Sequence, residues 1–246
     1  MTDAKVAVVT GAAQGIGLAL ARRLAETGYR VALLDVNAEA VEELARDLPG
    51  SIAVRCDVAD RDSVESCADR IANEWGHVDI LINNAGISPS HGGRSLPVEE
   101  TEVEEWHRVI AVNLTGTFLM CRSLLPIMKP RSWGRIVNFS SQGGRTRSRL
   151  SGAHYGATKA GVIGFTRVLA GQVGAHGITA NCIAPGRIVT PQSESFGDKS
   201  TYVDDIPAGR LGQTDDIVAG VEYLISDRAS FVTGTVLDVN GGFYMP

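Results

Sequence analysis

The stretch Thr10-Gly11-Ala12-Ala13-Gln14-Gly15-Ile16-Gly17 decides the fold, because it joins an apolar run at residues 6–10 to an amphipathic segment at residues 15–27. Glycine permits the sharp turn and the close backbone approach that such a junction requires. The N–H groups at the start of the following helix attract a pyrophosphate. A tight turn without any ligand can carry the same glycines, so the motif needs support from other positions.

Asp35 provides that support, since it ends the next apolar run, at residues 30–35, and stands 18 residues after Gly17. A carboxylate in this place can accept hydrogen bonds from the ribose hydroxyls of NAD and repels the 2′-phosphate of NADP. Position 14 is Gln, and Val36 and Asn37 follow Asp35, so no arginine close in sequence favours that phosphate. The sequence therefore predicts NAD as the cofactor.

Short β-branched runs alternate with segments of helical period along the whole chain. This order predicts one doubly wound α/β domain over residues 1–246, a Rossmann-type parallel sheet with helices on both faces. Residues 189–212 mix Pro, Ser, Gly and Asp without a period, and we expect a substrate lid there. The predicted strands are 6–10, 30–35, 52–56, 78–83, 136–140, 179–184 and 236–239, and the predicted helices are 15–27, 38–47, 62–75, 100–113, 115–128, 153–175 and 215–226.

The composition excludes several classes of protein. Hydrophobic residues make up 44% and charged residues 21% of 246, and a net charge of −5 gives no reason to expect nucleic acid as a partner. No apolar run approaches the ~20 residues that span a bilayer, and the N-terminus leads directly into a strand without room for a signal peptide. We therefore expect a cytoplasmic protein that does not bind membranes. The cysteines (Cys56, Cys67, Cys121, Cys182) lack metal-binding spacing, so we expect reduced thiols and no metal site.

Tyr155 and Lys159 are the candidate chemical pair, because a spacing of four places both side chains on one face of a helix. An ammonium about 4 Å from the phenol, at an effective dielectric of about 20, favours the phenolate by roughly 4 kcal/mol. This energy corresponds to about three pKa units and would bring the pKa of Tyr155 close to neutrality, where a general acid/base works best. Alone, the pair would be an ordinary surface contact.

The motifs in combination resemble the short-chain dehydrogenase/reductase family from about Lys5 to Gly242. The residues that carry the resemblance are T-G-x-x-x-G-x-G at 10–17, Asn83-Asn84-Ala85-Gly86, Asn113, Ser141, Tyr155-x-x-x-Lys159 and Pro185-Gly186. The resemblance implies a seven-stranded sheet, a nicotinamide cofactor and hydride transfer. It implies that Tyr155 takes the substrate's hydroxyl proton and that Ser141 bonds the substrate oxygen. It also implies that Lys159 lowers the tyrosine pKa and bonds the cofactor ribose, and that Asn113 holds a relay water.

The resemblance also implies a set of cofactor contacts. In it, Asp57 and Val58 contact the adenine, and residues 185–190 hold the nicotinamide carboxamide. Each has a simpler alternative, such as a helix cap at Asp57 or a loop corner at Pro185. The full set is Gly11, Gln14, Gly15, Ile16, Gly17, Asp35, Val36, Asp57, Val58, Asn83, Ala85, Gly86, Tyr155, Lys159, Pro185, Gly186, Ile188 and Thr190.

One spacing departs from the family pattern. Ser141 stands 14 residues before Tyr155, whereas the family most often has 13, which would place Gln142 at the catalytic position. We favour one extra residue in the loop, because the strand pattern that runs to Ser141 ends where the family's does. We expect Ser140 to be a structural hydroxyl.

The substrate is the least determined part of the prediction. Arginines in the loop 143–149 and Arg187 suit an anionic group, while a solvated or subunit-interface loop is the alternative. The predicted substrate contacts are Gly143, Arg145, Arg147, Arg149, His154 and Arg187. Few aromatic residues and a polar lid favour a sugar or polyol, including an acidic or sulfonated sugar.

The predicted function is an NAD-dependent oxidoreductase that acts on a secondary alcohol or ketone. The alternatives are a 3-oxoacyl carrier-protein reductase, against which Asp35 argues, and a non-catalytic NAD-binding regulator. The family resemblance further implies a homotetramer that pairs through helices 115–128 and 153–175 and through the C-terminal strand. The apolar tail at 241–246 fits burial at such an interface.

Overall fold

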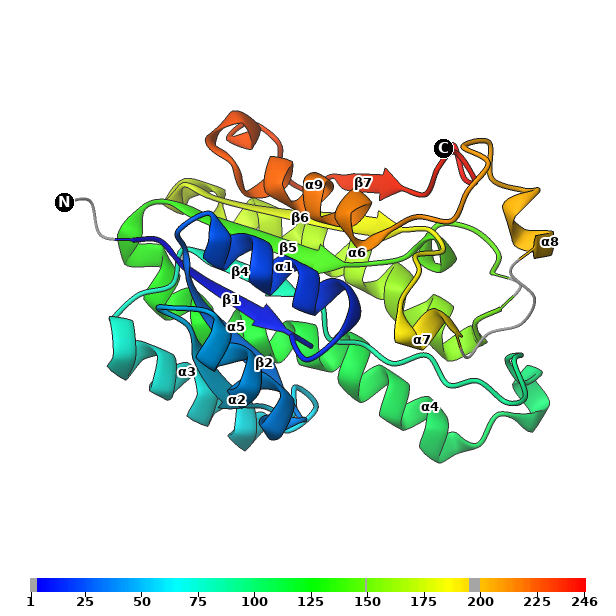
Figure 1. Ribbon diagram of the computed structural model, residues 1–246, viewed down its shortest axis with the longest axis horizontal. Coiled ribbons are helices and arrows are strands. Elements are labelled where there is room, and N and C mark those ends of the chain that lie inside the picture. The colour runs from blue at the N-terminus through cyan, green and yellow to red at the C-terminus, as the bar shows by residue number, and fades with distance from the viewer. Residues whose placement is uncertain (1–3, 149, 195–199) are drawn as a thin grey trace.

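Seven parallel strands form one sheet in the order β3-β2-β1-β4-β5-β6-β7, as the sequence predicts (Figure 1). The computed structural model describes residues 4–148, 150–194 and 200–246. The chain order reverses between β1 and β4, and open α/β sheets bind ligands beyond the carboxyl ends of the strands at such a point. The strands are β1 Val6–Thr10, β2 Arg30–Asp35, β3 Ile52–Arg55, β4 Ile80–Asn83, β5 Gly134–Phe139, β6 Ile178–Pro185 and β7 Val236–Val239.

Helices cover both faces of the sheet, and each face has its own apolar core. One core joins the sheet to α1, α2 and α9, and the other joins it to α3, α5 and α6. The central strands β4, β5 and β6 are buried along their whole length, which explains their nearly continuous apolar sequences. The helices are α1 Gly15–Glu26, α2 Ala38–Asp47, α3 Arg61–Trp75, α4 Val103–Ile110, α5 Gly116–Met128, α6 Ala153–Val173, α7 Pro191–Glu194, α8 Ser200–Val203 and α9 Thr214–Ile225.

The two consecutive helices predicted at 100–113 and 115–128 are present as α4 and α5, but the first begins later and the chain stays helical between them. Residues 98–100 form only a short 3₁₀ turn, and α4 continues into α5 through a π-helical turn at Ala111–Thr115. The backbone stays helical at both junctions, since Ala111 and Gly116 have φ near −60°. The other predicted boundaries match the observed ones or differ from them by one or two residues, as where β5 begins at Gly134 and β4 at Ile80.

The helical stretch Val103–Arg131 is long and apolar enough to cross a membrane by length and composition alone. Part of it nevertheless lies in the core, because α5 packs against α3 and β4 while α4 packs against α6, and 44% of its most apolar window is buried. The core helix of a globular domain meets the same criteria, so we assign this stretch to the core.

The lid expected at 189–212 contains two short helices, α7 and α8, and residues 195–199 lie outside the described residues. Both helices lie at the carboxyl end of the sheet, and α8 is the one nearer the C-terminal tail (Figure 1). The backbone of Ala208 donates a hydrogen bond to the carbonyl of Gly241. The lid region therefore rests on the tail of the same chain.

Candidate active site

Two adjoining cavities open beyond the carboxyl ends of the central strands. The first is lined mainly by residues that follow β5 and β6, and the second by residues that follow β1, β2 and β3. Ile16, Asn84, Gly86 and Thr190 line both cavities, so the two are continuous. Of the predicted cofactor residues, Gly11, Gln14, Gly15, Ile16, Asp35, Val36, Asp57, Val58, Ala85, Gly86, Tyr155, Lys159, Pro185, Gly186, Ile188 and Thr190 line one or both.

The glycine turn has the geometry that its sequence predicts. Gly11 and Gly15 have φ of 66° and 57°, a region that side chains disfavour. Gly17 does not line a cavity, and a Cβ there would overlap the carbonyl oxygen of Gly11. The amide of Asn84 donates to the carbonyl oxygens of Thr10 at 2.9 Å and Gly11 at 3.2 Å. Asn84, which follows the neighbouring strand β4, thus stabilises the glycine turn. It is not among the cofactor residues predicted from the sequence.

Asp35 lies beside the second cavity with its carboxylate fixed by the backbone. Its oxygens accept hydrogen bonds from the N–H groups of Ala13 and Asn37, both at 3.0 Å. No arginine directly follows Asp35 in sequence, but Arg108 of α4 lines the same cavity. Its guanidinium pairs with the carboxylate of Asp57 at 3.6 Å. Asp57 is not the cap of α3, because Asp60 takes that position.

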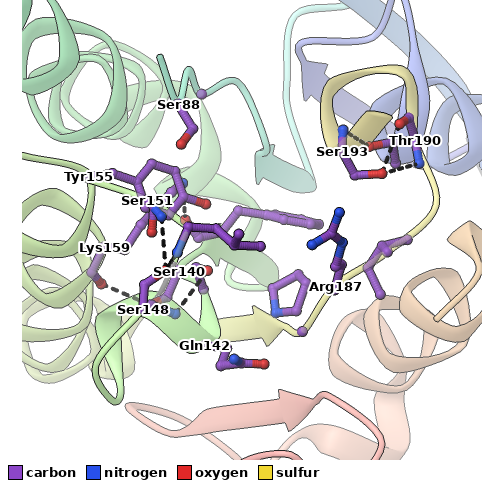
Figure 2. A pocket seen from close by; sticks show the side chains of 18 of the residues that line it. Ser88, Ser140, Gln142, Ser148, Ser151, Tyr155, Lys159, Arg187, Thr190 and Ser193 are labelled. Carbon is purple, nitrogen blue, oxygen red and sulfur yellow. Dashed lines mark hydrogen bonds between the residues drawn. The ribbon is translucent and has the colours of Figure 1, made fainter. Parts of the chain in front are cut away.

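Tyr155 and Lys159 lie together in the first cavity (Figure 2), and Ser141 lines the same cavity. The Ser141 hydroxyl is hydrogen-bonded to the Tyr155 phenol. The Lys159 ammonium lies 5.6 Å from the centre of the Tyr155 ring and donates to the carbonyl of Phe139 at 2.7 Å. The i, i+4 spacing therefore brings phenol and ammonium to one cavity, as expected.

The electrostatic expectation for Tyr155 is wrong for the protein without bound molecules. Burial raises the pKa of Tyr155 above its usual value, and the hydrogen bond with Ser141 only partly opposes this shift. Burial also lowers the pKa of Lys159 to about 8. The estimate from charge alone omitted desolvation, which penalises both the phenolate and the ammonium. The site favours the protonated phenol.

The two serines after β5 have different surroundings. Ser140 is buried and donates from its hydroxyl to the carbonyl of Lys159 at 2.8 Å, a structural bond. Ser141 precedes a 3₁₀ turn, Gln142–Gly144, and its hydroxyl accepts a hydrogen bond from the N–H of Gly143 at 3.1 Å. Ser141, and not Gln142, is therefore the residue that bonds the tyrosine.

Asn113 lies within the π-helical turn between α4 and α5, where such turns often mark functional sites. Its side chain is buried, accepts from the N–H of Ile87 at 2.8 Å and donates to the carbonyl of Ile87 at 2.9 Å. The side-chain amide is thus occupied by the loop after β4. The relay water that the family resemblance implies at Asn113 stays a prediction.

Asn83 was expected beside the cofactor, but it lies in the core between strands. Its amide donates to Asn138 at 2.8 Å, and Asn138 donates to Thr166 at 2.9 Å. The pleat explains this difference, since successive strand residues point to opposite sides. Asn83 therefore steadies the central sheet without lining either cavity.

The predicted substrate residues separate into two groups. Gly143 and Arg187 line the first cavity, whereas Arg145, Arg147 and His154 do not, and Arg149 lies outside the described residues. Arg145 forms a two-point ion pair with Asp238, at 3.2 and 3.0 Å. Arg147 is exposed.

His154 also faces away from the first cavity. Its ring bonds the carboxylate of Glu105 at 2.9 Å. Its position next to Tyr155 in sequence therefore does not make it a substrate contact.

The first cavity has more polar lining than the sequence revealed. Tyr202 of α8 accepts a hydrogen bond at its hydroxyl from the amide of Gln142 at 2.7 Å, and its ring stacks on Phe243 with centres 4.9 Å apart. The Arg187 guanidinium lies 5.2 Å from the centre of the Tyr202 ring. No sequence period signals these contacts, because they join loops and the tail. The added polar lining residues are Ser88, Gln142, Ser148, Ser151, Ser193 and Tyr202 (Figure 2).

Comparisons with known proteins identify chains of similar sequence and fold. A family model described as enoyl-(acyl carrier protein) reductase matches residues 11–244. The chain is 40% identical to D-threitol dehydrogenase of Mycolicibacterium smegmatis, over 98% of this chain and 93% of that protein. It is 39% identical to 3-oxoacyl-[acyl-carrier-protein] reductase of Haemophilus influenzae, over 98% of each chain.

Among solved structures, a 3-oxoacyl-[acyl-carrier protein] reductase of Brucella melitensis with bound NAD superposes with a TM-score of 0.92. It is 39% identical, and the match covers 100% of this chain and 93% of that one. These relatives are oxidoreductases, and so this protein is an enzyme that acts on CH–OH or keto groups. The chain belongs to the short-chain dehydrogenase/reductase family.

Proposed function

We propose that this enzyme is an NAD-dependent dehydrogenase of a secondary alcohol in a sugar or polyol. The observation that carries the proposal is the lining of the first cavity, where hydroxyl, amide and guanidinium groups surround Tyr155. A polyhydroxylated substrate can exchange hydrogen bonds with such walls, whereas a long acyl chain would leave them unpaired. The similarity to D-threitol dehydrogenase supports the same substrate class.

The second cavity fits the adenosine half of a dinucleotide. Gly11, Gly15 and the start of α1 would accept the pyrophosphate, and Asp35 would accept the ribose hydroxyls. When bound, the nicotinamide supplies hydride transfer. Asp35 supports NAD over NADP, although Arg108 beside Asp57 is a cation that a 2′-phosphate could approach.

The residues of the first cavity would manage the proton. In the direction of ketone reduction, Tyr155 donates its phenol proton to the substrate oxygen, and burial favours the protonated phenol that this step needs. Ser141 would hold the same oxygen. Lys159 would stabilise the phenolate left behind, with its ammonium fixed by Phe139.

Steady-state kinetics with NAD and NADP tests the cofactor assignment. We expect kcat/KM with NAD to exceed that with NADP by at least about tenfold, roughly 1.4 kcal/mol of transition-state preference. The variant Asp35→Asn keeps the size of the side chain and removes the charge that repels the phosphate, so this ratio should fall. Equal or better activity with NADP in the unmodified enzyme would contradict the assignment.

Substitution of the two serines tests the proton path. Ser141→Ala should lower kcat by about 100-fold or more, since a positioned donor on the reacting oxygen is worth about that much. Ser140→Ala is the matched control, because its hydroxyl bonds the backbone of Lys159. A larger loss of kcat for Ser140→Ala would reverse the assignment.

The second candidate is a 3-oxoacyl carrier-protein reductase, which the similarity to the Haemophilus influenzae and Brucella melitensis proteins favours. A panel of tetritols, pentitols, acidic sugars and acetoacetyl thioesters, followed by NADH absorbance, separates the two. We expect the highest kcat/KM with a polyol or sugar. Preference for the thioester would support the second candidate, and turnover of any panel member excludes an idle NAD-binding regulator.

We further propose a cytoplasmic homotetramer that forms through α5 and α6. Phe118 on α5 is 46% exposed and packs edge-on against Phe165 of α6, and Val168 is 62% exposed. These side chains form an apolar patch across the two helices that a second subunit could cover. Light scattering should give four times the chain mass of 26.1 kDa, and a monomer would refute this assembly.

In the tail, Phe243 stacks on Tyr202 of its own chain, whereas Met245 is exposed and could be covered by a second subunit.

A further inference from the structure

The N-terminus of α6 lacks the usual side-chain cap, although this helix carries Tyr155 and Lys159. Gly152 occupies the N-cap position and has no side chain to offer. The first N–H groups of a helix have no partner inside the helix and must find one elsewhere. The N–H of Tyr155, in the first turn, donates to Nδ1 of His154 at 2.7 Å. The imidazole of His154 therefore caps the backbone of the tyrosine.

This bond determines the tautomer of His154. A ring nitrogen that accepts a hydrogen bond carries no proton, so in the neutral ring the proton lies on Nε2. Nε2 is 2.9 Å from Oε1 of Glu105 and can donate to it. The ring is 3% exposed and has both nitrogens bonded. Glu105 of α4 thus orients a neutral histidine that in turn holds Tyr155.

Glu105 also joins a third element to this arrangement. Its Oε2 lies 2.8 Å from Nε2 of His91, whose side chain is 41% exposed. His91 belongs to the loop after β4, which also contributes Ser88 to the first cavity. Partial burial raises the pKa of Glu105, but the hydrogen bonds from His154 and His91 outweigh it and hold the net pKa below its usual value. The carboxylate is therefore ionised between the two rings.

We propose that Glu105 and His154 are positioning residues for the reaction at Tyr155, and that protonation of His154 at Nδ1 switches this positioning off. A protonated Nδ1 cannot accept the N–H of Tyr155, and a positive ring at a helix N-terminus is unfavourable. The titratable groups around the ring in the described part of the chain are Glu105 from α4, His91 from the loop and Tyr155 itself. Protonation of the His154 ring would therefore release the backbone N–H of Tyr155.

The proposal depends on the reaction class and not on the identity of the substrate. His154→Asn keeps an oxygen that can accept the Tyr155 N–H but does not titrate between pH 5 and 8. We expect the acid limb of the kcat/KM profile in the unmodified enzyme to be absent in this variant. At neutral pH, kcat should fall by about five- to tenfold with KM within about twofold, the loss expected from one misaligned hydrogen bond.

Two further variants separate positioning from simple stability. Glu105→Gln removes the charge that favours a protonated ring, so the acid limb should move to lower pH while the melting temperature stays close to that of the unmodified enzyme. His91→Asn is the matched control, since it breaks the other bond to the same carboxylate, and its acid limb should stay in place. An unchanged profile in His154→Asn, or an equal pH-independent loss of kcat in all three variants, would overturn the proposal.

The assay uses butane-2,3-diol with NAD and acetoacetyl thioester with NADH, so that either candidate function allows the measurement. If neither is turned over by the unmodified enzyme, the positioning role is measured by hydrogen exchange of the segment 152–160, which is independent of the proposed function. After correction for the intrinsic exchange rate, the backbone amides of this segment should stay protected between pH 5 and 8 in His154→Asn. In the unmodified enzyme the same amides should lose protection as the pH falls. Identical pH dependence in both proteins would then refute the role of His154.

Discussion

Replacing Arg145 by methionine tests whether the arginine loop binds substrate or anchors the C-terminal region. Its guanidinium bonds both carboxylate oxygens of Asp238 on β7, at 3.2 and 3.0 Å, and lies 5.3 Å from the centre of the Tyr244 ring. An arginine held in this way has its planar donors committed to a protein carboxylate. We therefore expect Arg145→Met to lower the free energy of unfolding and to leave KM within about twofold of the unmodified value.

The size of this loss follows from the burial of the pair. The side chains of Arg145 and Asp238 are 17% and 15% exposed. Exposed ion pairs contribute about 0.2–1 kcal/mol to the free energy of unfolding, whereas breaking a fully buried pair lowers it by about 3–5 kcal/mol. Because this pair is partly buried, Arg145→Met should lower the free energy of unfolding by about 2 kcal/mol. For a chain of this length, that loss lowers the melting temperature by about 4–8 °C.

The assay is thermal and urea unfolding at one fixed protein concentration, because an oligomer's stability depends on concentration. Arg147→Met is the matched control, since this exposed arginine of the same loop should change stability by no more than about 0.5 kcal/mol. The double variant Arg145→Met/Asp238→Asn should lose less than the sum of the two single variants, because it leaves no unpaired charge. Unchanged stability together with a KM raised about tenfold would refute this reasoning and restore the anion-binding role of Arg145.

Two more predictions test the cofactor turn and the buried lysine. Gly17→Ala places a Cβ against the carbonyl oxygen of Gly11, so it should abolish the fluorescence enhancement of NADH on binding. Gly164→Ala is the control, because no atom lies within 4 Å of its added Cβ, and it should bind NADH normally. For Lys159, a folded-state pKa of about 8 against an unfolded value near 10.4 means that the unfolded chain binds more protons between these pH values. The free energy of unfolding relative to Lys159→Met should therefore rise from pH 8 to pH 10, and a constant difference would contradict the burial argument.

The sheet and its helices could be predicted because each element has a local signal. Strands such as β4 are short apolar runs, and α1 follows a glycine turn whose φ values need no tertiary context. The junction of α4 and α5 was missed because a π-helical turn at Ala111–Thr115 has no local sequence signature. Tertiary packing against α3 and α6 keeps the two helices continuous.

The reactive groups of the site could be predicted by residue type and spacing, but their energetics could not. The spacing of Tyr155 and Lys159 predicts that they share a cavity, whereas the direction of the tyrosine pKa depends on burial, which no spacing reveals. The partners of Arg145 and His154 lie 93 and 49 residues away in the chain. Because these partners are not evident from the sequence, Arg145 and His154 were predicted as substrate contacts.

The loop between Ser141 and Tyr155 contributes to the polar character of the first cavity. Ser140 is bonded to the carbonyl of Lys159, and Gly144 lies so close to the backbone of Lys159 that a Cβ would collide with it. Both sides of Ser141 are therefore held against α6, which explains why its hydroxyl still bonds the tyrosine at a spacing of 14.

Beyond Gly144, the hydroxyl of Ser148 accepts hydrogen bonds from the N–H groups of Leu150 and Ser151 at 3.2 and 3.0 Å. Ser148, Leu150 and Ser151 all line the first cavity, so this loop places two hydroxyl groups close to Tyr155. These hydroxyls add to the polar wall of the cavity without displacing Ser141, which is held against α6.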